Sequence, residues 1–180
     1  MIKNLTWFVF LLLVLFMGFQ GRVLQCSNSR HYTIVQLETA RQSQGQAILH
    51  AWDSIRYGKG TMLDLVRSNT HWDFLFIICY VSLIMMESNA QMQRERWLFL
   101  NELLRLNLLL ALLAGLCDVA ENTMLLHNFR HVSDGRYYLE TFWVTYPKFI
   151  FAFWAVVVWL VSVVKSGVIG LFGAKVVAES

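Results

Sequence analysis

The sequence predicts an all-α integral membrane protein, a transmembrane four-helix up-down bundle with an additional amphipathic helix in an outer loop. Three observations support this fold class. Of the 180 residues, 57% are hydrophobic and 15% are charged, against roughly 45–50% and 25% in soluble domains. The mean hydropathy is +0.48. The apolar residues fall in four unbroken runs, whereas a membrane β-barrel shows alternation along each strand.

Composition also excludes other classes of protein. The chain is too apolar and too weakly charged to be disordered, and three cysteines are too few to staple a fold with disulfides. The net charge is only +3 and the basic residues are scattered, so no nucleic-acid partner is expected. The length indicates a single integral membrane domain, 1–180.

The first apolar run lies within residues 5–21, behind Lys3. A charge followed by a short apolar core also begins a secretory signal peptide, whose cleavage site needs small residues at two positions before the cut. The segments 18–21 and 23–26 fit that pattern poorly. We therefore favour a retained membrane helix over a cleaved signal peptide.

The other three runs predict helices at about 71–88, 98–126 and 147–170. A bilayer core of about 30 Å requires about 20 helical residues. Because the first two runs are short, they must extend to interfacial residues such as Trp7 and Trp72.

The basic residues of the short connections predict the orientation. Arg94 and Arg96 lie between the second and third runs, and Lys3 and Lys165 flank the first and fourth. Short loops rich in Lys and Arg face the cytoplasm. We therefore expect a multi-pass protein of the bacterial inner (plasma) membrane, with both termini in the cytoplasm.

The outer segment 33–57 has the pattern of an amphipathic helix. Thr33 and Gln36 have the spacing of a capping box, and the Gly58–Gly60 stretch ends the pattern. Apolar residues recur between them at roughly helical spacing: Ile34, Leu37, Ile48, Leu49, Trp52 and Ile55. This helix is expected either on the membrane surface or bundle mouth, or packed on the other outer loop.

The third predicted helix carries a polar stripe where lipid would be expected. At about 100° per residue, its polar and small residues fall within about 60° of Asp118: Asn107, Ala111, Ala114, Gly115, Asp118, Glu121 and Asn122. Leucines cover the rest of the circumference. The stripe must face protein or water, and Ala111 and Gly115 form a small-xxx-small pair that permits close helix approach.

The second and fourth predicted helices also carry polar faces. Asp73 and Tyr80 lie in the first half of the second helix, and Lys148 opens the fourth, followed on its face by Ala152, Ala155, Trp159, Ser162 and Ser166. In an up-down bundle these residues reach the same leaflet as Asp118, Glu121 and Asn122. Lys148 is expected to pair with Asp118, Glu121 or Asp73, because an isolated charge in the membrane is costly.

We call these residues, together with Glu38 of the outer helix as a lid, the polar cluster: Glu38, Asp73, Tyr80, Asp118, Glu121, Asn122 and Lys148. One lysine against three intramembrane carboxyls leaves an acid to bind a proton, a metal or a ligand. The cluster either binds such a species or fixes the register of the helices through polar contacts between them. His127 and His131 have the i, i+4 spacing of metal ligands, without a complete ligand motif, and no cofactor is expected.

The stretch Ala114–Asn122, with Asp73 and Tyr80 before it and Lys148 after it, resembles a set of bacterial four-helix integral membrane proteins. Their third helix carries a D-x-x-E-N motif, and the set has no established activity. The likeness extends to the outer stretch 35–52. It implies the four-helix fold and the placement of the polar residues, and it implies no reaction.

The leading functional hypothesis is a non-enzymatic inner-membrane protein, either an accessory subunit of a larger membrane complex or a small bundle that binds a ligand or lipid. One alternative is an intramembrane enzyme acting on a lipid or isoprenoid headgroup, with Glu121 or Asp118 as general base. The other is a proton or ion pathway. The inner half of the third helix offers only Asn107 and Arg105, which argues against such a pathway.

Overall fold

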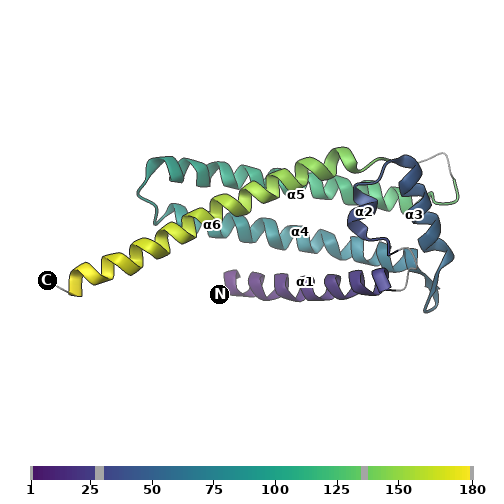
Figure 1. Cartoon of the computed structure of the whole chain (residues 1–180), viewed down its shortest axis with the longest axis horizontal. Helices are drawn as coiled ribbons and strands as arrows, with labels where there is room; N and C mark the ends of the chain where they lie inside the picture. Colours follow the sequence, from purple (N-terminus) through teal and green to yellow (C-terminus); the bar gives the residue numbers. More distant parts are fainter. Residues whose placement is uncertain (1, 27–30, 135–137, 179–180) are drawn as a thin grey trace.

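The computed structural model describes residues 2–26, 31–134 and 138–178, with side chains as far as Gly167. Within these ranges the chain forms six helices and one pair of two-residue strands (Figure 1). Four of the helices are long and apolar enough to cross a membrane. The predicted all-α, four-span fold class is therefore confirmed.

The four long helices extend beyond the apolar runs that predicted them. They are α1 (Ile2–Cys26), α4 (Met62–Met92), α5 (Leu98–Arg130) and α6 (Phe142–Ala178). The predicted start of α4 at residue 71 is wrong because polar residues lead into the helix, where Asp64 accepts a hydrogen bond of 3.0 Å from the Thr61 amide. Pro147, predicted to begin the last helix, lies inside α6.

The long helices pack in chain order. The α4 helix contacts both α1 and α5, and α6 packs mainly on α5. Figure 1 shows α1 alongside α4, and α6 crossing α5 diagonally. Ala111 and Gly115 of α5 are buried, and Gly115 faces Val81 of α4. Gly115 of the small-xxx-small pair therefore lies in the α4–α5 interface.

The outer segment forms two helices, so the single helix predicted over 33–57 is wrong. The capping box is present, and it begins α2 (Ile34–Glu38) with a 2.9 Å bond from the Thr33 amide to Gln36. The chain then breaks and resumes as α3 (Gln42–Ser54). The Glu140 side chain accepts a hydrogen bond from the Gln42 amide at 3.1 Å, so a distant loop supplies the cap that begins α3.

A tight hairpin connects α3 to α4. Its strands are β1 (Arg56–Tyr57) and β2 (Gly60–Thr61), paired antiparallel. Gly58 has φ +59, a conformation that glycine adopts without steric cost. The glycine-rich stretch predicted to end the outer helix therefore forms the turn of this hairpin.

The two outer helices cover one end of the bundle (Figure 1). Ile48, Leu49 and Trp52 of α3 are buried in one hydrophobic core with residues of α4 and α5, among them Val66 and Phe129. Tyr138 of the α5–α6 loop also belongs to this core, and its ring fills the space that a side chain at Gly45 would occupy. The amphipathic face thus packs on both the bundle mouth and the other outer loop.

Replacing Gly115 by Ala should lower the free energy of unfolding. A Cβ at this position would lie 2.7 Å from Val81 Cγ2, and a valine in a helix has few alternative rotamers. The helices must separate, at an expected cost of about 1–3 kcal/mol. Unfolding in mixed detergent–SDS micelles measures the change.

The matched control is Gly18→Ala in α1, where a Cβ would meet no atom within 4 Å. This change should leave the protein equally or slightly more stable, because alanine favours the helix. Equal effects at the two glycines would contradict the close α4–α5 approach.

Candidate functional site

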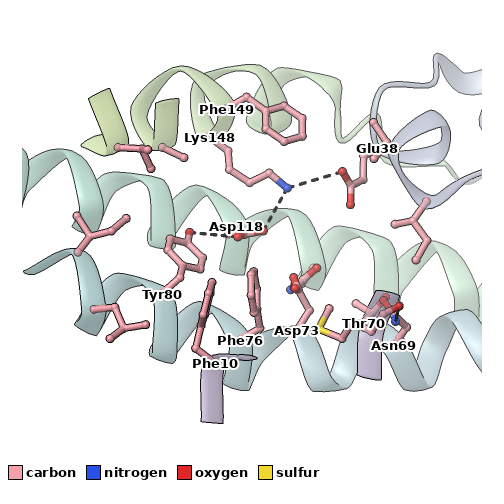
Figure 2. A pocket seen from close by; sticks show the side chains of 18 of the residues that line it. Phe10, Glu38, Asn69, Thr70, Asp73, Phe76, Tyr80, Asp118, Lys148 and Phe149 are labelled. Atoms are coloured by element: carbon pink, nitrogen blue, oxygen red, sulfur yellow. Dashed lines mark hydrogen bonds and ion pairs between the residues drawn. The ribbon is translucent and has the colours of Figure 1, made fainter. Parts of the chain in front are cut away.

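The polar cluster centres on the ammonium group of Lys148 in α6. Lys148 Nζ lies 3.2 Å from Asp118 Oδ1 and 2.9 Å from the Glu121 carboxylate, both on α5. Glu38 Oε2 of α2 lies 3.7 Å away. One lysine therefore connects three helices through three carboxylates (Figure 2, where Glu121 is not drawn).

Helix geometry explains how these groups meet. Asp118, Glu121 and Asn122 are separated by three and four residues, so they project from one face of α5. Thr145 stands one turn before Lys148 in α6, and its hydroxyl donates to Glu121 Oε2 at 2.8 Å. Thr145 was not among the predicted site residues, although its i, i+3 spacing to Lys148 was the available signal.

Asp73 and Tyr80 of α4 complete the cluster. The Tyr80 hydroxyl donates to Asp118 Oδ2 at 3.1 Å, and the Asn122 amide donates to Asp73 Oδ2 at 2.7 Å. In the part of the chain that the structure describes, Asp73 forms no salt bridge. Lys148 thus pairs with two of its three expected intramembrane partners, and Glu38 takes the place of Asp73.

Burial makes the central ion pairs energetically important. Glu121 is 0% exposed, Asp118 7% and Lys148 8%. Removing such charges from water costs several kcal/mol per ion, and only close pairing and hydrogen bonding recover that cost. The carboxylates and Lys148 therefore depend on one another to remain in the interior.

Glu38 is held against the cluster by its backbone as well as its side chain. Its carbonyl oxygen accepts a hydrogen bond from Thr141 Oγ1 at 2.7 Å, and Thr145 Oγ1 lies 3.2 Å from the same oxygen. Burial raises the pKa of Glu38 to about 8; Lys148 opposes this rise, and the negative charge of Glu121 adds to it. Within the fold, α2 is thus anchored over the outer end of α6.

A groove of about 570 Å³ adjoins the cluster. Residues of α1, α2, α4, α5 and α6 line it. Along α4 its lining runs from Asn69 past Asp73, Phe76 and Leu83 to Glu87. Glu121 is not among its lining residues, so it lies behind the cluster, away from the groove.

Aromatic rings line the groove beside the acids. Phe10 of α1 stacks on Phe76 of α4 with ring centroids 5.3 Å apart, and Phe76 lies 5.5 Å from the Tyr80 ring. On the α6 side, Lys148 Nζ lies 4.8 Å above the Phe149 ring. Figure 2 shows Phe10 and Phe76 between Tyr80 and Asp73. The sequence did not identify Phe10 or Phe76, since nothing in a single chain indicates which helices border a groove.

The opposite half of the bundle is more polar than the sequence indicated. Asn107 is fully buried and donates to Ser88 Oγ and to the Ala155 carbonyl, each at 2.9 Å. Ser166 donates to Gln91 at 3.2 Å. The expectation of a sparse polar half rested on α5 alone and missed what α4 and α6 contribute.

Acidic residues pair with lysines of α1 and α6 in this half. Glu87 forms a 2.8 Å salt bridge to Lys3 and accepts a 3.0 Å hydrogen bond from Trp7 Nε1. Glu95 pairs with Lys165. The spacing of Glu87 and Ser88 to Gln91 places these groups on one side of α4, and Glu95 follows in the α4–α5 connection.

The two candidate metal ligands lie at the outer end of α5. The rings of His127 and His131 are 4.3 Å apart, and His131 Nδ1 lies 2.9 Å from the His127 carbonyl. Among the residues described, no third His, Cys, Asp or Glu joins them in a group that could hold a metal ion.

These observations define the class: a multi-pass helical membrane protein with a buried ion-pair cluster beside an apolar groove. Comparison with family models, with curated proteins and with solved structures found no match to this chain. The resemblance to the bacterial proteins with the D-x-x-E-N helix therefore stays a prediction.

A double-mutant cycle on Lys148 and Glu121 should reveal strong coupling. Lys148→Met leaves three carboxylates without their cation and should cost about 3–5 kcal/mol of unfolding free energy. Glu121→Gln should cost less, because Lys148 keeps two partners. The double variant should lose less than the sum of the singles. SDS-induced unfolding measures all three.

The exposed pair Arg105–Glu102, at 64% and 66% side-chain exposure, is the control. A cycle on this pair should yield a coupling below about 1 kcal/mol. Additive effects at Lys148 and Glu121 would contradict the coupling described here.

Stability should depend on pH through Glu38. Because its folded pKa is about 8 against an ordinary 4.5, the folded protein binds more protons than the unfolded chain between these values. The free energy of unfolding therefore falls as the pH rises through this window. Below the window the pH dependence disappears, because the carboxyl group is protonated in both the folded and the unfolded state. Unfolding of wild type and Glu38→Gln across this range measures the difference.

Relative to Glu38→Gln, the wild type should lose stability as the pH rises from 4.5 to about 8. Glu102→Gln, which changes an exposed carboxylate and retains Glu38, should follow the wild type across this range. A wild type that gains stability relative to Glu38→Gln would mean that Lys148 outweighs burial.

Proposed function

We propose that this chain is a non-enzymatic membrane protein that binds one amphiphile in the groove, with the headgroup at the polar cluster and the chain along the apolar wall. The supporting observation is the continuity of these two surfaces in one cavity of about 570 Å³. Ligand pockets of roughly 300–1,000 Å³ typically combine an apolar lining with a few polar groups that orient the ligand.

The position of the groove favours an occupant from the membrane. Its lining includes residues of α1 and α6, which pack on α4 and α5. All four helices are apolar enough to span a bilayer, so the groove lies at the depth of the lipid chains in the membrane. Ionisable residues inside a membrane usually mark a binding or transport site.

The geometry favours binding over general-base catalysis. Glu121 accepts hydrogen bonds from both Thr145 and Lys148 and does not line the groove. Asp118 accepts bonds from Tyr80 and Lys148. A general base must reach the proton that it removes, and these two carboxylates are already occupied by groups of the protein.

We also propose the bacterial inner membrane as the location, with both termini in the cytoplasm. Arg94 and Arg96 in the short α4–α5 connection, with Lys3 and Lys165 at the same end of the bundle, support this orientation. The polar cluster would then lie in the outer leaflet.

Filling the groove should displace the amphiphile. Ala152 lines the groove, and Ala152→Phe places a ring where the chain of the ligand would lie. After purification in dodecyl maltoside, mass spectrometry of the extracted lipids should find a lipid enriched in the wild type and depleted in this variant.

Leu160→Phe, at an exposed position of the same helix (45% exposed), is the control and should retain the lipid. A wild type that purifies without an enriched lipid, or a lipid that survives Ala152→Phe, would contradict the proposal. Co-purification of a larger membrane complex in place of a lipid would favour the accessory-subunit hypothesis.

A further inference from the structure

The charges around the groove are unbalanced. Four carboxyl groups, those of Glu38, Asp73, Asp118 and Glu121, belong to the polar cluster together with a single lysine. Even with Glu38 protonated at neutral pH, three carboxyl groups remain for one lysine. Lys148 is the only basic side chain among the described residues that line the groove. Its ammonium has three protons to donate and has three carboxylates around it. An anionic headgroup would meet surplus negative charge and no free cation.

Asp73 is the acid of the polar cluster that pairs with no cation among the described residues. It lines the groove and is only partly buried. Its hydrogen bond comes from the neutral amide of Asn122, and the described residues supply no cation at salt-bridge distance. A carboxylate at membrane depth is costly without a partner. A cation on the ligand would supply that partner.

The aromatic rings beside Asp73 favour a particular kind of cation. Phe76 follows Asp73 by three residues on α4, stacks on Phe10 and borders Tyr80. Ammonium groups bind the faces of such rings, and aromatic walls are the usual site for quaternary ammonium. The Lys148 ammonium above the Phe149 ring, at 4.8 Å, is an example within the same site. Figure 2 shows Asp73, Phe76 and Phe10 lining one stretch of the groove.

We infer that the amphiphile bound in the groove carries a cationic ammonium headgroup, which pairs with Asp73 and lies against the rings of Phe10 and Phe76. This inference rests on the proposed binding function and specifies its ligand class. The alkyl chain follows the groove past Leu83 and Ile84 towards Trp159, and Lys148 keeps its three carboxylates throughout.

Three probes with the same sixteen-carbon chain test the headgroup. They are hexadecyltrimethylammonium, hexadecanol and hexadecanoate, radiolabelled and bound to the full chain in dodecyl maltoside, a detergent without an ammonium group. Saturable binding is measured by scintillation proximity. The ammonium probe should bind about tenfold or more tightly than either of the others, since a charge-assisted contact to a carboxylate is stronger than a neutral one.

Variants assign this preference to the site. Asp73→Asn should reduce binding of the ammonium probe to the level of hexadecanol and leave hexadecanol binding unchanged. Asp73→Glu should keep the preference, and Phe76→Leu should weaken it. Asp53→Asn, which changes an exposed carboxylate of α3, should have no effect. If Asp73→Asn fails to fold, the wild-type affinities and Asp73→Glu still decide the question.

The outcomes separate the inference from the function on which it rests. If hexadecanol binds saturably and the ammonium probe binds no more tightly, or if hexadecanoate binds best, the cationic headgroup is wrong and the binding function stands. A preference that persists in Asp73→Asn also overturns it. If none of the three probes binds saturably, the proposed function itself fails.

Discussion

The buried ammonium of Lys148 is the interaction on which the arrangement of the outer half depends. It lies within 3.7 Å of carboxylates from α2 and α5, so α6, α5 and the outer α2 meet at one atom. Without this cation, Asp118 and Glu121 would be charges in a nearly dry interior, and Glu38 would have no reason to enter it. The lid and the bundle are therefore one electrostatic unit, and the position of α2 over the groove follows from the position of Lys148 in α6.

Much of this unit was predictable because helix geometry is rigid. A period of 3.6 residues places Asp118, Glu121 and Asn122 on one face, and an up-down order brings Lys148 to the same depth. The break between α2 and α3 was not predictable, because the Glu140 side chain that caps α3 lies 98 residues further along the chain. The extents of α4 and α6 were also missed, since apolar runs mark the part of a helix that meets lipid and not its polar ends.

The groove could not be predicted from the sequence, for a different reason. Periodicity shows which face of a helix is polar, but the shape of a cavity depends on which helices pack together and which remain apart. Here α1 packs on α4 and α6 packs mainly on α5, and residues of all four helices line the groove. Phe10 and Phe76, read along the chain, are ordinary residues of apolar runs. Only the packing of α1 against α4 brings their rings together beside Asp73.

Asp73 also distinguishes a binding site from a device that only fixes helix register. Register needs matched partners, and Lys148 with Asp118 and Glu121 already supplies them as buried ion pairs. Asp73 adds a further carboxylate at membrane depth and gains a single neutral amide. In a purely structural cluster, Asp73 would raise the free energy of the folded state. A neutral partner for Asn122 would fix the helix register equally well. The presence of Asp73 at the lining of the groove is explained when the missing positive charge arrives with a ligand.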